Sequence, residues 1–426
     1  MSANTKSNLV IVSEMPMKRS DYEALDRADP LAAKRDCFFI PEGMIYLDGN
    51  SLGMMPKHVP ERLAEVAVKQ WGETLIKSWN EHGWFDLPRK VGDRIARLIG
   101  APPASVIAGD TISVNLFKLL SAAAKMNPSR RVILSDDGNF PSDLYVAQGF
   151  RDLLDDGYAL KIVAPEEVME AIDESIAFTM LTEVDYRTAR LHDMKAVTAK
   201  AHAAGALTIW DLAHSAGATP VDLTGAQADF AVGCTYKYLN GGPGAPAFLY
   251  VRPGLQDKVR VALAGWWGHA SPFAFDLEYR PAPGIIRNQC GTQPILSLAA
   301  LDAALDIWDD VDMRVLRGKS LALCSTFIDL VEQRCGKHGV RLASPRDMAS
   351  RGSHVSLHYP QGYAVMQALI AGRVIGDFRS PDMMRFGFTP LYTRFADVWD
   401  AADILARILD TREWDQPQFL AKKAVT

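Results

Sequence analysis

The chain has 426 residues, of which 48% are hydrophobic and 23% are charged, a composition typical of soluble globular proteins. Its net charge of −5 argues against the broad basic surface that nucleic-acid binding requires. The five cysteines include no C-x-x-C pair, which argues against a disulfide framework or a zinc site. The sequence has no long apolar run at its start or elsewhere, so we expect a soluble, cytoplasmic protein. From the cysteine pattern we also expect no metal site.

Near the N-terminus, residues 20–35 are predicted to form a helix that is capped by Ser20, with Glu23 three positions on. Residues 44–53, M-I-Y-L-D-G-N-S-L-G, are typical of a strand that runs into a glycine-rich turn. Residues 56–77 then show the apolar spacing of a helix.

This turn also matches the G-x-S-x-G pattern of serine hydrolases, with Ser51 in the place of the nucleophile. The match comes at the first strand, whereas a hydrolase nucleophile normally follows several strands. Short patterns of this kind also arise by chance in glycine-rich turns. A structural turn is therefore favoured, and a serine hydrolase is kept as an alternative.

Aromatic residues are dense in two stretches of the chain. The first contains Trp71, Trp79, Trp84 and Phe85, and the second spans residues 264–275. The residues of the first stretch either fill a core or line a pocket for a flat aromatic substrate, and the sequence favours neither. The second stretch is an aromatic-rich loop without clear periodicity.

Two strand-to-helix junctions have residues suited to bind a ligand. A strand that ends near residue 108 leads into a helix with Thr111 and Ser113 in its first turn, where free backbone N–H groups favour a phosphate. An ordinary N-cap explains these hydroxyls equally well. After a strand at residues 131–135, Phe140 is placed to stack on a ring and Asp143 to meet its polar edge, unless both simply cap the next helix.

Strands predicted at residues 177–181, 206–210 and 230–232, with a helix at 192–204, continue this alternation. Strands that alternate with helices form βαβ units. We therefore predict an α/β fold with a mostly parallel sheet that is flanked by helices.

The two last strands of this series are each followed by an ionisable residue, Asp211 and Lys237. In open α/β sheets, ligands bind outside the carboxyl ends of the strands. A pyridoxal phosphate (PLP) enzyme needs a lysine to form a Schiff base and a carboxylate to hold the pyridine nitrogen protonated. Taken alone, Lys237 is also typical of an ordinary strand-end lysine whose charged end reaches solvent. The pair together predicts a PLP site.

The C-terminal part is predicted to form a smaller α+β domain at residues 300–426, after a large PLP-binding domain at 56–299 and an N-terminal segment at 1–55 that packs with the small domain. His354 and His358 are four residues apart, but they fall on a predicted strand without an acidic partner. We therefore expect no metal there.

Several motifs occur in an order that resembles the kynureninase family, PLP enzymes of fold type I in the aspartate aminotransferase superfamily. The resemblance covers about residues 40 to 400, and its motifs are Y-L-D-G-N-S-L-G, S-V-N-L-F-K, F-P-S-D, D-L-A-H, T-Y-K-Y-L-N-G-G-P-G and C-G-T-Q-P. It implies hydrolysis of L-kynurenine to anthranilate and L-alanine, and more weakly of 3-hydroxykynurenine to 3-hydroxyanthranilate and L-alanine, in tryptophan catabolism and NAD biosynthesis. It also implies a homodimer with shared active sites.

The resemblance assigns roles residue by residue. Lys237 would carry the cofactor, Asp211 would pair with the pyridine nitrogen, and Tyr236 would relay a proton or donate to the substrate carbonyl. Arg385 would bind the substrate carboxylate, and Trp79 would line the substrate pocket. The further cofactor contacts that it implies are Ile112, Ser113, Phe140, Pro141, Ser142, Asp143, Thr182, His214 and, from a second subunit, Trp266 and Thr292.

Two details of the resemblance bear on specificity. Ile112 has no side-chain donor, so phosphate contacts at this point must come from backbone N–H groups, Thr111 or Ser113. Trp79 together with Thr292 is similar to the family members that prefer kynurenine over its 3-hydroxy form. The alternative outside the family is another fold-type-I PLP enzyme, such as a cysteine desulfurase or a transaminase, although Cys324 and Cys335 fall in helical sequence rather than in a mobile loop.

Overall fold

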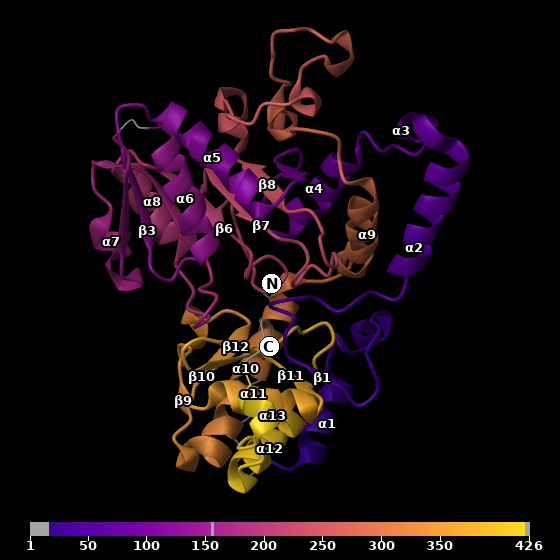
Figure 1. Ribbon diagram of the computed structural model, residues 1–426, viewed down its shortest axis with the longest axis vertical. Coiled ribbons are helices and arrows are strands. Elements are labelled where there is room, and N and C mark those ends of the chain that lie inside the picture. The colour runs from indigo at the N-terminus through magenta and orange to yellow at the C-terminus, as the bar shows by residue number, and fades with distance from the viewer. Residues whose placement is uncertain (1–16, 155–156, 422–426) are drawn as a thin grey trace, which may run out of the picture. The chain divides into compact units, whose positions relative to one another are not determined.

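A computed structural model describes residues 17–154 and 157–421 of the chain (Figure 1). These residues divide into two compact units. One consists of the described residues up to Lys57, Arg187–Arg190 and the described residues from Ile307 onward. The other consists of the described residues of His58–Tyr186 and of Leu191–Asp306.

The second unit is built on a sheet that has seven strands among the described residues. Its strands are β2 (Val106–Ala108), β3 (Val132–Asp136), β4 (Ala159–Val163), β5 (Ile176–Thr182), β6 (Leu207–Asp211), β7 (Phe230–Gly233) and β8 (Phe248–Val251). Their order is β2-β8-β7-β6-β5-β3-β4, with parallel pairing from β4 to β7 and β8 antiparallel to both of its neighbours. The predicted α/β fold with a mostly parallel sheet is therefore confirmed.

Helices cover this sheet, so its central strands are runs of buried apolar residues. The helices are α4 (Leu87–Leu98), α5 (Ile112–Met126), α6 (Pro141–Leu154), α7 (Val168–Ala171) and α8 (Met194–Ala203). α5 buries Leu116 and Leu119 in the same core as Phe178 and Phe230 of the sheet. Because β2, β3, β5, β6 and β7 run in one direction, the loops after these strands meet at one edge of the sheet.

The edge strand β4 is absent from the sequence-based prediction. Its residues are exposed or half-exposed, with Lys161 at the centre, so they lack the apolar run that marks the inner strands. β3 supplies its backbone partners in parallel register. An edge strand of this kind is specified by its neighbour rather than by its own side chains.

The rest of the second unit is helical or irregular. Its remaining elements are α2 (Val59–Glu65), the π-helix η2 (Val66–Thr74), η3 (Leu75–Lys77), α3 (Ser78–Glu81), η4 (Pro165–Glu167), η5 (Pro253–Lys258), η6 (Trp266–Gly268), η7 (Pro272–Ala274), η8 (Gly284–Asn288), α9 (Ile295–Leu305) and, at the boundary of the unit, η9 (Asp306–Trp308). α2 packs against α9 (Figure 1). The helix predicted at 56–77 is thus present, but it widens into a π-helix after Glu65.

The first unit combines helices with small sheets. Its elements are α1 (Arg19–Ala28), η1 (Ala32–Cys37), β1 (Ile45–Tyr46), α10 (Met313–Cys335), η10 (Gly336–His338), β9 (Arg341–Leu342), η11 (Met348–Ser350), β10 (His354–His358), α11 (Gly362–Ala371), β11 (Val374–Ile375), β12 (Asp377–Arg379), β13 (Met383–Gly387), α12 (Phe395–Thr411) and α13 (Pro417–Leu420). Among the described residues, β12-β13-β10-β9 form an antiparallel sheet and β1 pairs with β11. α10, α11 and α12 enclose a core with Phe327, Phe386 and Leu405.

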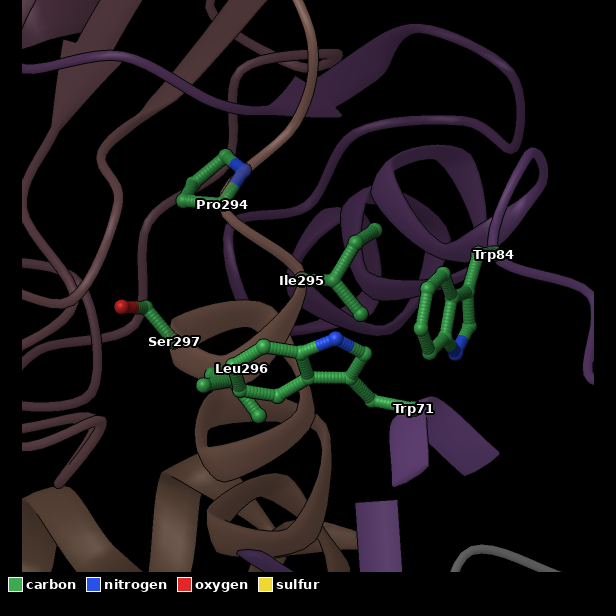
Figure 2. Close-up of a pocket in the computed structure, with 6 residues that line it drawn as sticks. All are labelled: Trp71, Trp84, Pro294, Ile295, Leu296 and Ser297. Atoms are coloured by element: carbon green, nitrogen blue, oxygen red, sulfur yellow. The ribbon is translucent and has the colours of Figure 1, made fainter. Parts of the chain in front are cut away.

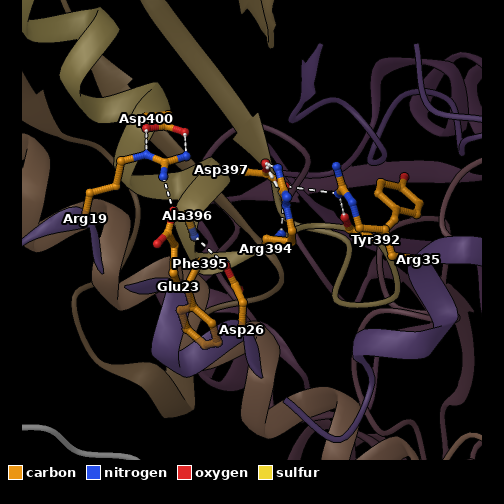
Figure 3. A network of polar contacts seen from close by, with 10 residues as sticks. All are labelled: Arg19, Glu23, Asp26, Arg35, Tyr392, Arg394, Phe395, Ala396, Asp397 and Asp400. Carbon is orange, nitrogen blue, oxygen red and sulfur yellow. Dashed lines mark hydrogen bonds and ion pairs between the residues drawn. The ribbon is translucent and has the colours of Figure 1, made fainter. Parts of the chain in front are cut away.

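The N-terminal helix α1 is joined to the first two turns of α12 by polar contacts (Figure 3). Asp26 accepts hydrogen bonds from the backbone N–H groups of Phe395 at 2.6 Å and Ala396 at 3.0 Å. Arg19 donates to both carboxylate oxygens of Asp400, at 2.7 and 2.8 Å. Asp26 therefore satisfies N–H groups at the start of α12 that have no partner inside that helix.

The predicted boundaries of α1 are wrong at both ends. It begins at Arg19 rather than Ser20, and the capping pair is Lys18 with Asp21, whose carboxylate accepts from the Lys18 N–H at 2.7 Å. It ends at Ala28 because Pro30 forces Asp29 into an extended conformation.

Candidate active site

Lys237 lies in the loop after β7, at the carboxyl edge of the large sheet. This loop is fixed by Thr235, whose hydroxyl donates to the Pro246 carbonyl at 2.6 Å. Lys237 Nζ lies 3.2 Å from His214 Nε2 and 6.0 Å from the centre of the Phe140 ring. Three residues predicted to contact the cofactor, from three different loops, are thus brought together around one amine.

Two buried carboxylates, Asp211 and Asp143, lie close to this amine. Burial raises the pKa of Asp211 to about 6, although Lys237 and the Ala213 N–H oppose the shift. Burial, together with Asp211, also raises the pKa of Asp143, again opposed by Lys237. Asp143 Oδ2 is buried and has no hydrogen-bond partner among the described residues. Two buried acids of this kind favour the binding of a ligand that places a cationic or N–H group next to them.

Thr182 and Asp211 are partners across the β5–β6 register, so the threonine adjoins the buried acid. Its hydroxyl donates to the Val184 carbonyl at 3.3 Å. Tyr236 precedes the lysine, and burial raises the pKa of its hydroxyl. This hydroxyl therefore stays protonated at neutral pH and is able to donate a hydrogen bond.

The helices α5 and α6 begin at the same edge of the sheet. Thr111 caps α5 by accepting from the Val114 N–H at 3.3 Å. Ser113 in the first turn of α5 and Ser142, which follows Pro141 at the start of α6, have hydroxyl oxygens 3.4 Å apart. Hydroxyls and unpaired N–H groups at helix N-termini suit an anion such as a phosphate. The half-buried Ile112 contributes only its backbone to such contacts.

The first aromatic stretch lines two cavities of the second unit. A cavity of about 660 Å³ is lined by Ile76, Trp79, Asn80, Phe85, Trp266, Trp267, Phe273 and Thr292. Trp79 and Trp267 meet edge to face, with ring centres 5.1 Å apart. In the other, a groove of about 370 Å³, Trp71 and Trp84 face the first turn of α9 (Figure 2). The aromatic residues that the sequence left open between core and pocket therefore line pockets.

Arg385 belongs to the first unit, where it is buried on β13. Its Nε donates to Asp377 Oδ1 at 2.8 Å, and its Nη2 donates to the same carboxylate and, at 2.9 Å, to Ser51 Oγ. Asp48 is the second acid of this cluster. Burial is the main cause that raises its pKa to about 7, and the negative charge of Asp377 adds to the shift. Neither acid is among the site residues predicted from the sequence, although Asp48 belongs to the motif Y-L-D-G-N-S-L-G.

The contacts of Ser51 do not support its alternative role as a nucleophile. Its hydroxyl donates to Asp377 at 2.8 Å and accepts from Arg385. A serine nucleophile instead needs a base, usually a histidine, to accept its proton. His354 and His358 lie on the strand β10, as predicted.

The residues of the second unit fit PLP as a group. Lys237 suits its aldehyde, and the buried acids Asp211 and Asp143 suit its pyridine nitrogen. Phe140 suits the face of its ring, and the hydroxyls at the starts of α5 and α6 suit its phosphate.

Solved structures with the same fold place the chain in a class. An apo cysteine desulfurase from Thermococcus onnurineus NA1 matches 89% of this chain and 98% of its own, with a TM-score of 0.74 and 18% identity. The cystine C-S lyase C-DES, in complex with cysteine persulfide, matches 86% of this chain and 98% of its own, with a TM-score of 0.73 and 15% identity. The fold is that of the fold-type-I PLP enzymes.

Sequence comparison identifies the family. The kynureninase of Pseudomonas fluorescens is 55% identical over 96% of this chain and 99% of its own length, and that of Burkholderia pseudomallei (strain 1106a) is 54% identical over the same shares. Residues 316–405 match the model of the kynureninase C-terminal domain. The chain belongs to the kynureninase family.

Family membership confirms the predicted enzyme class, a PLP-dependent hydrolase, and its cofactor. The desulfurase alternative is not favoured. Cys324 and Cys335 are buried in α10, and burial raises their thiol pKa values to about 11 and 12. Neither is available as the thiolate that a desulfurase uses.

Proposed function

We propose that this chain cleaves the Cβ–Cγ bond of L-kynurenine with water, and that it releases anthranilate and L-alanine. The observation that carries the proposal is the cluster of Lys237, His214 and the buried Asp211 at the carboxyl edge of the sheet. Each of these residues has the chemistry that a PLP enzyme of this family needs at that point.

The proposal assigns the cofactor to named residues. Lys237 would hold its aldehyde carbon, and Asp211 would hold its pyridine nitrogen. When bound, PLP supplies an electron sink for the bonds at the substrate Cα. The other residues proposed to hold it are Ile112, Ser113, Phe140, Pro141, Ser142, Asp143, Thr182, His214 and Tyr236, with Trp266 and Thr292 of a second subunit.

The protein's own groups then manage the protons. Lys237 Nζ takes the Cα proton of the substrate, and His214 Nε2 at 3.2 Å is placed to exchange a proton with it. Tyr236 donates its hydroxyl proton toward the substrate carbonyl, and the raised pKa of this hydroxyl keeps it protonated until that step.

Substrate recognition combines a cation with an aromatic pocket. Arg385 binds the substrate carboxylate, a task suited to a planar guanidinium. Trp79 and Thr292 border the cavity that accepts the aromatic ring. The proposed preference for kynurenine over 3-hydroxykynurenine rests on the bulky indole of Trp79 and on residue 292, which is a threonine and not an amide.

The proposal includes a cytoplasmic homodimer that shares its active sites. Exposed aromatic side chains beside the cavity, including Phe273 and Phe275, support a second subunit there. Among the residues that the structure describes, no helix is both long and apolar enough to cross a membrane.

The first test is an absorbance spectrum of the purified protein, followed by addition of L-kynurenine while the fluorescence of anthranilate is recorded. We expect a yellow chromophore that borohydride bleaches, and anthranilate release. Both are expected to disappear in Lys237→Ala. A yellow protein that does not act on kynurenine would overturn the substrate, and a protein that stays colourless with added PLP would overturn the cofactor.

A further inference from the structure

Lys118 is a charged residue in the middle of α5 whose side chain is completely buried. It belongs to the motif S-V-N-L-F-K, but none of the roles assigned above uses it. Its ammonium donates to Asp110 Oδ2 at 2.6 Å and to the Asn288 carbonyl at 2.6 Å. Moving an ammonium group out of water is costly, and its hydrogen-bonded partners at best offset this cost. Stability alone therefore does not explain a lysine at this position.

The first partner holds the loop that starts α5. Asp110 has a φ of +53°, a left-handed conformation that is uncommon for a residue with a side chain. The loop is fixed on both sides, because the Ala247 N–H donates to the Asp110 carbonyl at 2.9 Å and Asn115 Nδ2 donates to the Gly109 carbonyl at 2.9 Å. The ion pair with Lys118 completes this fixation from inside the helix.

The second partner lies in the segment that leads to Thr292. Asn288 ends η8, and two residues later the Cys290 carbonyl accepts from the Trp267 N–H at 3.0 Å. Gly265 packs so closely on Cys290 that a Cβ at this glycine would lie 2.4 Å from the carbonyl oxygen. The segment that Lys118 contacts is therefore the one that supports the aromatic cavity.

We propose that Lys118 is a positioning residue. It fixes the loop before α5 so that the N–H groups and Ser113 at the helix start are preorganised for the cofactor phosphate. The same ammonium ties this loop to the segment of Asn288–Thr292. This inference rests on the proposed function, because it assumes that PLP binds at this edge of the sheet.

The test compares the affinities for PLP and for pyridoxal, which has the same aldehyde and ring but no phosphate. Lys118→Met keeps the length of the side chain and removes its charge, and Lys125→Met is the matched control on the exposed face of the same helix. Apo-protein is titrated with each compound, and the fold is checked by circular dichroism. We expect Lys118→Met to reduce the preference for PLP over pyridoxal about tenfold or more, and Lys125→Met to leave it unchanged.

A merely structural lysine would weaken the binding of both compounds equally, and an unchanged ratio in folded Lys118→Met would overturn the inference. If that variant does not fold, Asp110→Asn decides, because asparagine tolerates the left-handed conformation and removes only the charge. A lowered PLP preference in Asp110→Asn supports the inference, and an unchanged one overturns it. Wild type that binds neither compound would instead overturn the proposed function.

Discussion

Asp211 shows at the scale of one residue how a functional group is held at a cost to stability. In the cofactor-free protein its pKa is about 6, above the ordinary value of 3.8, and burial is the main cause. A folded-state pKa above the unfolded one means that the folded protein binds the proton more tightly. The corresponding stability is complete below about pH 4 and is lost as the pH rises through 6. At pH 8 the ionised side chain lowers the free energy of unfolding by about 3 kcal/mol.

We therefore predict that Asp211→Asn stabilises the cofactor-free protein at pH 8 by about 1–3 kcal/mol, and by much less at pH 5. Urea unfolding at the two pH values measures this difference. The same variant should release anthranilate at least about 100-fold more slowly, because an amide does not hold the pyridine nitrogen protonated. Asp152→Asn, on the exposed side of α6, is the control and should change neither quantity. An equal effect of Asp211→Asn at both pH values would contradict the argument.

At the scale of elements, α4 packs on the first strand of the large sheet through a single glycine. A Cβ at Gly92 would lie 2.2 Å from the Val106 carbonyl oxygen and 2.8 Å from its carbon. Both atoms are backbone atoms of β2, so no side-chain rotation relieves the clash. Helix and strand have to separate before any larger residue fits.

The prediction is that Gly92→Ala lowers the free energy of unfolding by about 2 kcal/mol or more. Gly149→Ala in α6 is the matched control, because no atom lies within 4 Å of the added Cβ. There the higher helix propensity of alanine should stabilise by about 0.5–1 kcal/mol. Denaturant unfolding of both variants measures the two effects, and a neutral Gly92→Ala would show that α4 shifts freely on β2.

The elements that the sequence predicts well are those with strong apolar patterns. The inner strands predicted at 177–181, 206–210 and 230–232, and the helix with Thr111 and Ser113 at its start, are present close to their predicted positions. The exposed edge strand β4 has no such pattern. The change from the α-helix α2 to the π-helix η2 depends on tertiary packing, which the local sequence does not indicate.

At the scale of the whole molecule, the proposed shared active site makes a prediction about mixed subunits. Lys237→Ala and Trp266→Ala should each be inactive or nearly so alone. A dimer formed from one of each has one site with the lysine of one chain and the tryptophan of the other. Random mixing should therefore restore about a quarter of the wild-type activity.

The measurement is anthranilate release after the two variants are unfolded together in equal amounts and refolded. Lys237→Ala alone, unfolded and refolded in the same way, is the control and should stay inactive. If mixing restores nothing while each variant still forms dimers of about twice the 46.8 kDa chain mass, the sites are not shared in the proposed manner.

The sequence by itself determined the fold class, the family and the pair of Lys237 and Asp211. Buried parallel strands, and ionisable residues directly after them, leave a local pattern that is readable without coordinates. Only the tertiary structure decided which side chains meet. The 3.2 Å contact of Lys237 with His214, the buried Asp143 Oδ2 that has no hydrogen-bond partner in the described part of the chain, and the contacts of Lys118 with Asp110 and Asn288 are such cases. Lys237 and His214 are 23 residues apart and Lys118 and Asn288 are 170 residues apart, and the cost of burying their charges depends on neighbours that no local pattern specifies.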